Sequence, residues 1–289
     1  MERSYETAKD MYECIKGRYS CRKFTDRHID NDLLHELISI GLCAPTGGNL
    51  QPYSIITVRK NETKEELAKL CGQSFIAKAD VNLVFILDWS KIKNYAVNQD
   101  APFVANNSFV HNLIAFADVV CAAQIIEMAA SMSGLGACIV GNILGNGTVL
   151  SPLLNLPYNC YPVLMLSMGY PDLKSKEYMR KTTYDAMVFS ETYPDDRMGL
   201  IPLLNEKYCD MSTKLPNADK YAGQWLDKIE EALLTTYSNE RTEEIISKIK
   251  ESGRINEMQR RFCLKYASHN SVEEAKKVKK DMMLCGIKI

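Results

Sequence analysis

The sequence predicts an α+β fold, in which short β-type runs are interspersed with helices. Apolar and β-branched runs occur at 53–58, 81–87, 137–140 and 161–166. Between the second and third lies a long stretch, 112–133, that is apolar on nearly all sides of a helix and therefore belongs in the core. With 289 residues, 46% of them hydrophobic, the chain can bury a large core in one or two domains.

The first predicted helix begins after the N-cap Asp30 and ends at Ala44-Pro45. Its apolar positions keep helical spacing: Leu33, Leu34, Leu37, Ile38 and Leu42. The following segment, 46–52, is too rich in Gly, Asn and Pro for regular structure and leads into the strand 53–58. Thr63-Lys64-Glu65-Glu66 matches a capping box and predicts a short helix before the strand 81–87.

Residues 88–108 are polar and aromatic without a clear period, which indicates a long loop or a short irregular helix. Gly134 is expected to end the long apolar helix, because a glycine readily adopts the positive φ of a helix C-terminus. Beyond it, a short helix near 149–154 should separate the strands 137–140 and 161–166, and 185–189 is predicted as one more strand.

The sequence becomes more charged after Gly169-Tyr170-Pro171. Helices are predicted around Trp225–Leu233, around Ile245–Ile249 and from Ser271 to about Gly286. The lysines near the end of the last helix, Lys276, Lys277, Lys279 and Lys280, suit a solvated helix C-terminus. We therefore expect a first domain at 1–194 and a helical C-terminal extension at 195–289, packed on that domain or on a partner chain.

Charge and composition exclude several classes of function. The 35 Lys and Arg residues balance 36 Asp and Glu residues, so the net charge of -1 argues against a protein that binds nucleic acid along its surface. The N-terminus carries no apolar leader, and the most apolar stretch contains Asp118, Gln124 and Glu127. We expect a cytoplasmic protein without a membrane span.

Cysteine, histidine and motif patterns exclude other chemistries. The ten cysteines are dispersed without a C-x-x-C pair and are expected to be reduced, and the four histidines are isolated, so no metal site is predicted. The chain has no G-x-G-x-x-G turn after a strand, no P-loop and no G-x-S-x-G. Ser20-Cys21-Arg22-Lys23 matches S-x-x-K but lacks the companion motifs of penicillin-recognising enzymes.

Two segments suit the binding of an anion and a polar ring. Arg18, Ser20 and Arg22 alternate, so in an extended segment they share one face and offer two guanidinium groups and a hydroxyl to a phosphate. In the 47–51 loop, glycines permit close backbone approach, while Asn49 and Gln51 carry amides that can donate and accept. Taken alone, alternating arginines more often form a solvated surface, and a loop of this composition is more often a plain turn.

In combination, these segments resemble the FMN-dependent nitroreductase family. Four blocks carry the resemblance in order: 18–24, 44–53, Asp118–Ala123 running to Gly134-Leu135-Gly136, and Leu156-Pro157 running through Gly169-Tyr170-Pro171 to Arg180-Lys181. They span residues 15 to about 190. The resemblance implies a mainly antiparallel sheet flanked by helices and an intertwined homodimer with FMN at its interface.

The resemblance also implies which residues hold FMN. Arg18, Ser20 and Arg180 would bind the phosphate, and Arg22 would approach the N1/O2 edge of the flavin, where positive charge favours hydride acceptance. Some relatives have a lysine where Tyr178 stands here, and Lys181 is the expected substitute. Thr46 and Gly47 would come from the partner chain. The remaining expected contacts are Tyr19, Pro45, Asn49 and Gln51, together with Ile139, Val140 and Gly141, whose backbone would lie near flavin N5. Asp118 is expected to make a buried hydrogen bond.

The implied activity is that of an FMN-dependent oxidoreductase working by a ping-pong mechanism. NADH or NADPH would reduce FMN, and a nitroaromatic, a quinone or a similar small molecule would then accept the electrons. The cofactor carries out the difficult step, so no catalytic side chain is assigned. Two alternatives stay open: a flavin-binding protein with little turnover that serves storage, sensing or partner binding, and a specialised reductive dehalogenation or flavin modification.

Overall fold

The computed structural model describes residues 5–172, 179–216 and 221–288 and divides into two compact units. The first unit comprises Met1–Tyr178 and Lys277–Ile289, and the second comprises Met179–Lys276. The expected division at 194/195 falls inside the second unit.

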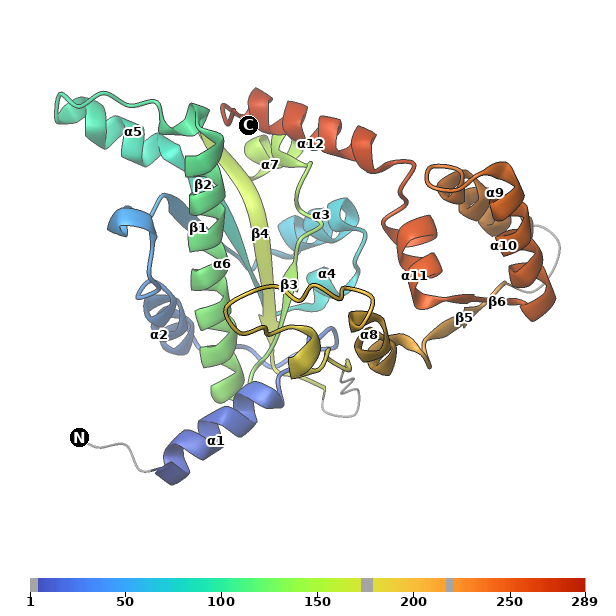
Figure 1. Cartoon of the computed structure of the whole chain (residues 1–289). Coiled ribbons are helices and arrows are strands. Elements are labelled where there is room, and N and C mark those ends of the chain that lie inside the picture. The colour runs from blue at the N-terminus through green and yellow to red at the C-terminus, as the bar shows by residue number, and fades with distance from the viewer. Residues whose placement is uncertain (1–4, 173–178, 217–220, 289) are drawn as a thin grey trace. The chain divides into compact units, whose positions relative to one another are not determined.

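A four-stranded antiparallel sheet forms the centre of the first unit (Figure 1). The strands are β1 (Tyr53–Val58), β2 (Val81–Asp88), β3 (Gly136–Val140) and β4 (Cys160–Gly169), in the spatial order β1-β2-β4-β3. The strands predicted at 53–58, 81–87, 137–140 and 161–166 are present, and the antiparallel arrangement implied by the family resemblance is confirmed. The central strands β2 and β4 are buried along nearly their whole length, which explains their continuous apolar sequences.

Helices cover the two faces of this sheet. Those of the first unit are α1 (Tyr5–Lys16), α2 (Asn31–Gly41), α3 (Asn61–Cys71), α4 (Phe75–Lys78), α5 (Trp89–Asn98), α6 (Phe109–Met132) and α7 (Gly147–Leu154). Successive side chains of β2 point to opposite faces of the sheet, and a hydrophobic core lies on each face. Leu83 and Phe85 pack with α2 and α6, whereas Val84 and Ile86 pack with α3 and α4. The sheet is therefore sandwiched between helices.

Helix α6 is the long apolar helix that the sequence predicts. Within the described part of the chain it alone is long and apolar enough, by length and composition, to cross a membrane, and 44% of its most apolar window is buried inside the protein. Ala122 and Ile126 pack in the core beside the sheet, which accounts for its composition. Gly134 follows the helix with a φ of 76°, as expected of a residue that ends it.

Some local predictions were wrong. The capping box at Thr63 is not used, because α3 begins two residues earlier with Lys60 as its N-cap. The irregular stretch after β2 contains a regular helix, α5, whose N-cap Asp88 accepts a hydrogen bond from the Lys91 backbone N–H. Helix α1 was not predicted.

The C-terminal segment is bound tightly into the first unit. Helix α12 (Ser271–Leu284) crosses from the second unit into the first, where Asp281 is buried against the start of α7. Asp281 accepts hydrogen bonds from the Gly147 and Thr148 backbone N–H groups, the Thr148 hydroxyl and the Tyr161 hydroxyl. Ile287, which follows the helix, is fully buried and belongs to the core of the first unit.

The second unit is mostly helical. It contains α8 (Leu200–Tyr208), α9 (Tyr221–Leu233), α10 (Asn239–Ser252), α11 (Glu257–Gln259), a π-helix at Arg260–Lys265, and a strand pair of β5 (Ser212–Lys214) and β6 (Arg254–Asn256). The helices expected around Trp225 and Ile245 are present, whereas the β5–β6 pair shows that the extension is not purely helical. The strand predicted at 185–189 is wrong: Tyr184–Ala186 forms a 3₁₀ turn, and Met187 and Val188 are exposed instead of buried in a sheet.

Candidate functional site

The Arg18–Arg22 segment lies along the outer edge of β3. Ser20 forms a parallel bridge with Ala137, and the Cys21 backbone N–H donates to the Ala137 carbonyl over 2.9 Å. Backbone groups of alternate residues in a strand point to the same edge, so Ile139 also turns its N–H toward this side. The structure thus brings the first predicted motif and the predicted 139–141 strand end together.

Arg18 is anchored by a carboxylate inside the protein. Its Nη1 donates to Glu127 Oε1 on α6 over 2.9 Å, and the two side chains are 23% and 3% exposed respectively. A carboxylate this deeply buried requires a partner, because removing an unpaired charge from water is costly. One N–H group of Arg18 therefore binds Glu127 inside the protein, and the other N–H groups of its guanidinium can donate to a ligand.

Arg22 lies near two buried thiols. Its guanidinium carbon is 5.9 Å from the centre of the Phe75 ring. Burial raises the pKa of Cys21 and of Cys138, and the positive charge of Arg22 opposes that rise at both. The two thiols are therefore protonated at neutral pH and are not activated nucleophiles.

Two glycines of β3 and its end shape this edge. A Cβ on Gly136 would lie 2.6 Å from the Cys21 sulfur, so only glycine allows the Arg18–Arg22 segment to approach β3 this closely. A Cβ on Gly141 would meet no atom within 4 Å, so the exposed end of the strand opens onto free space. A flat ring could approach the backbone there.

The 46–51 loop is tied to α6 at a different place. The Gly47 N–H donates to Asp118 Oδ1 over 2.9 Å, as expected for a buried Asp118, and a Cβ on Gly47 would lie 2.5 Å from Ile114 Cγ2. Asn49 and Gln51 have positive φ angles of 56° and 48°, a strained state that is frequent at functional sites.

Some side chains of this loop form hydrogen bonds that hold it, whereas others are exposed. Thr46 Oγ1 accepts from the Gln51 N–H, and Gln51 Nε2 donates to the Leu42 carbonyl, so both help to hold the loop. Pro45 and Asn49 are exposed. Of the two predicted amides, Asn49 is the one turned to the surface.

The loop and Arg18 attach to opposite sides of α6. Asp118 and Glu127 are nine residues apart, which corresponds to about 180° around the helix and roughly 13 Å along it. One chain therefore does not place its own Gly47 loop against its own Arg18.

The second predicted phosphate-binding segment belongs to the second unit. Arg180 Nη1 donates to the Glu206 carbonyl over 2.6 Å and lies 3.5 Å from Asp210 Oδ2, and Lys181 is exposed. Tyr178 lies outside the described residues.

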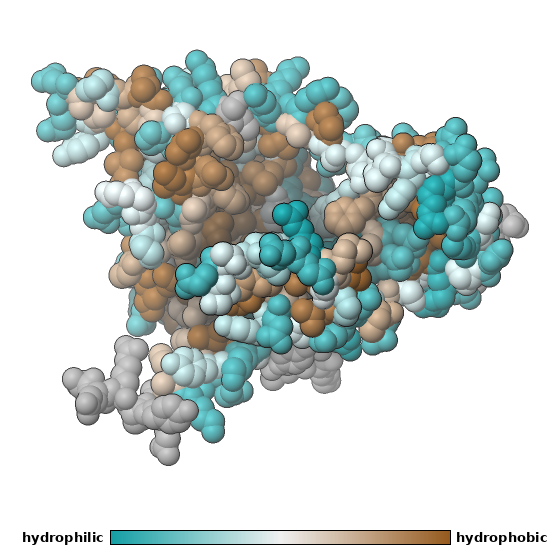
Figure 2. Space-filling view, in the orientation of Figure 1, coloured by the Kyte–Doolittle hydropathy of each residue, from teal (hydrophilic) through white to brown (hydrophobic). Residues whose placement is uncertain are grey.

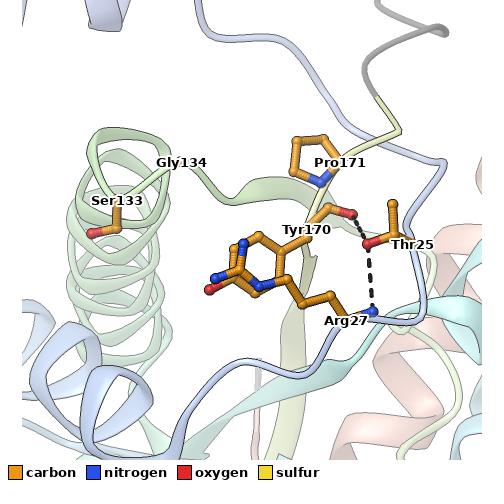
Figure 3. Close-up of a pocket in the computed structure, with 6 residues that line it drawn as sticks. All are labelled: Thr25, Arg27, Ser133, Gly134, Tyr170 and Pro171. Carbon is orange, nitrogen blue, oxygen red and sulfur yellow. Dashed lines mark hydrogen bonds between the residues drawn. The ribbon is translucent and has the colours of Figure 1, made fainter.

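A separate pocket of about 500 Å³ opens in the first unit, beside the end of α6 (Figure 3). In it, the Arg27 guanidinium stacks on the Tyr170 ring, 3.7 Å from the ring centre, and Thr25, Ser133, Gly134 and Pro171 complete the lining. It contains none of the predicted flavin-binding residues. Among the described residues, no group of three or more metal-binding side chains is clustered.

The sequence reasoning missed Glu127 as a site residue. Its signal was available, since it is one of the two carboxylates in an otherwise apolar helix. A buried carboxylate in such a helix calls for a cationic partner, and Arg18 is that partner.

Comparison with known proteins identifies relatives of the first unit. The Nitroreductase family model matches residues 15–170. An NADPH-dependent oxidoreductase of Staphylococcus haemolyticus is 27% identical over 164 residues, 56% of this chain and 64% of that protein. One from Staphylococcus aureus strain USA300 is 26% identical over 167 residues, 57% of this chain and 66% of that protein. The chain thus covers less than two thirds of the length of these curated relatives.

Solved structures extend the likeness. NADPH:FMN oxidoreductase from Vibrio harveyi, complexed with NAD+, is 27% identical with a TM-score of 0.62, covering 68% of this chain and 84% of that one. Nitroreductase A from Vibrio parahaemolyticus is 26% identical with a TM-score of 0.63, covering 84% and 97%. NfrA2 of Bacillus megaterium shares the fold over 97% of this chain and 98% of its own, with a TM-score of 0.69 and 22% identity. Because the family model covers more than half of the chain, this protein belongs to the nitroreductase family.

Proposed function

We propose that this protein is an FMN-dependent NAD(P)H oxidoreductase that reduces a nitroaromatic, a quinone or a similar small acceptor. The observation that carries the proposal is the alignment of the Arg18–Arg22 segment with the open edge of β3. This edge offers hydrogen-bond donors to a phosphate at one end and an uncovered strand backbone at the other. The family membership and the NADPH:FMN oxidoreductase among the similar structures support it.

The residues at this edge fit FMN. Arg18 and Ser20 would hold the phosphate, with Tyr19 beside them. Arg180 and Lys181 stay phosphate contacts that the sequence resemblance alone predicts. Arg22 would lie toward the N1/O2 edge of the flavin. The space beyond Gly141 admits a flat ring against the Ile139–Gly141 backbone, which satisfies the requirement for close approach.

Bound FMN would supply hydride acceptance from NADH or NADPH and electron transfer to the acceptor. The chain's own part is electrostatic and positional. Arg22 would provide a positive charge that stabilises negative charge on the reduced ring, and the buried thiols nearby stay protonated, because burial raises their pKa.

A homodimer completes the proposed site. Phe109, Val110, Leu113, Ile114 and Val120 are exposed on α6 and fall within about 140° of rotation, forming an apolar stripe (Figure 2). The Gly47 loop borders one edge of this stripe, and Glu127 with Arg18 lies toward the other. A second copy packed on the stripe by a two-fold axis would bring its own Thr46, Gly47, Asn49 and Gln51 to the Arg18 side.

The experiment begins with the purified protein and its visible spectrum, followed by titration of the flavin-free protein with FMN. We then measure NADH and NADPH oxidation with nitrofurazone and with menadione as acceptors. Stoichiometric FMN and acceptor-dependent turnover support the proposal. A protein that neither binds FMN nor oxidises either nicotinamide contradicts it.

Bound FMN that neither nicotinamide reduces would instead favour the flavin-binding alternative with little turnover. Reduction that proceeds with a halogenated aromatic but with neither standard acceptor would favour the specialised reaction.

A further inference from the structure

Glu127 is the carboxylate paired with the arginine expected to bind phosphate. An ionised carboxylate has no hydrogen to donate to an anion. The Glu127 side chain is only 3% exposed, so it cannot turn away into water. A phosphate that binds the free edge of Arg18 therefore approaches a fixed negative charge behind the same guanidinium.

Glu127 acts on Arg18 in two ways that a substitution can separate, through its hydrogen bond and through its negative charge. The Glu127 carboxylate fixes the Arg18 guanidinium through one hydrogen bond at 2.9 Å, and a glutamine could accept the same bond through its own Oε1. Only the carboxylate, however, neutralises the arginine. The hydrogen bond orients Arg18, whereas the negative charge reduces the attraction that an anion feels.

We propose that Glu127 is a counter-charge that weakens the phosphate contribution to FMN binding while it positions Arg18. This inference rests on the proposed function. The ligand class concerned is a flavin that carries a terminal phosphate, because a phosphate-free flavin does not meet the Arg18–Glu127 pair.

The size of the effect follows from Coulomb's law. At an effective dielectric constant of about 20, a unit negative charge roughly 7 Å from a phosphate opposes its binding by an energy equivalent to at least tenfold in affinity. We therefore expect Glu127→Gln to tighten FMN binding at least tenfold and to leave riboflavin binding unchanged.

The test is a fluorescence titration of flavin-free protein with FMN and, separately, with riboflavin, at low and high salt. Wild type is compared with Glu127→Gln and with Glu66→Gln, which removes one exposed carboxylate from α3 and controls for the net charge. Far-ultraviolet circular dichroism and melting curves show whether each variant is folded.

A selective gain in FMN affinity for Glu127→Gln, largest at low salt, supports the inference. Equal or weaker FMN binding by the folded variant overturns it, as does an equal gain for riboflavin. If wild type binds neither flavin, the proposed function fails instead, so the two failures are distinguishable.

A second variant covers the case of a misfolded Glu127→Gln. Glu127→Met removes the negative charge and keeps a side chain of similar size, so its affinity for FMN relative to riboflavin should exceed that of wild type. A ratio equal to or below that of wild type in the folded Glu127→Met variant would contradict the inference.

Discussion

Replacing Asp281 with asparagine should destabilise the first unit substantially. The carboxylate accepts four hydrogen bonds, two on each oxygen, at 2.6 to 3.0 Å. Asparagine retains one acceptor oxygen and turns an NH2 group toward two donors. Hydrogen bonds to charged groups contribute about 1.5–3 kcal/mol each, so the loss of two predicts a decrease of roughly 3 kcal/mol or more in the free energy of unfolding.

This decrease should lower the melting temperature by about 6–12 °C, since a unit of this size loses about 2–4 °C per kcal/mol. Differential scanning fluorimetry and urea unfolding measure it, with exposed Asp26→Asn as the matched control. Hydrogen bonds from Thr148, Tyr161 and Gly147 outweigh burial and lower the pKa of Asp281 in the folded protein. Its stabilisation is therefore complete above the unfolded pKa of about 3.9 and is lost as pH falls through the lower folded value.

The difference between wild type and Asp281→Asn should accordingly be largest near pH 7 and should shrink below about pH 4. A melting temperature within 2 °C of wild type at pH 7, or a difference that grows with acidity, would refute the role of the buried carboxylate.

Three further predictions concern the proposed site and dimer. Arg18→Ala and Arg180→Ala should each weaken FMN binding by about 1.5–3 kcal/mol in a fluorescence titration, and an unchanged dissociation constant would count against the assignment. Gly136→Ala should destabilise the protein by about 1–3 kcal/mol in urea unfolding, because its Cβ would meet the Cys21 side chain; wild-type stability would show that the segment can shift. Leu113→Asp should convert the dimer to monomer in light scattering after gel filtration, and a monomeric wild type would contradict the proposed interface.

The sheet was predictable because its strands are separated by clear turn residues. Val81–Asp88 and Cys160–Gly169 are continuous apolar runs, and such runs are stable only when both faces are covered. Their pairing order was not derivable from periodicity, because register depends on contacts distant in sequence. The family resemblance implied only a mainly antiparallel sheet, and the order β1-β2-β4-β3 was not predicted.

The errors share a physical cause. The 185–189 segment has strand-like residues but pairs with no strand among the residues that the structure describes, and a strand is not stable without a partner. The β5–β6 pair is too short to show a period, and each strand has only three residues.

The site was partly predictable. The alternation of Arg18, Ser20 and Arg22 predicts a shared face, and the structure lays this segment along β3. The need of Glu127 for a cationic partner was visible in the sequence, but the identity of that partner was not, since Arg18 lies 109 positions away. The relation of the Gly47 loop to Arg18 became evident only from their places on α6.

FMN binding at the Arg18–Arg22 edge is the central element of the proposed function. Isothermal titration of the flavin-free protein with FMN, for wild type and for Arg18→Ala, measures this binding. One FMN per chain, bound at least tenfold more weakly by the folded Arg18→Ala variant, is the predicted result. FMN binding of equal strength by both proteins, or no binding by wild type, would contradict the account.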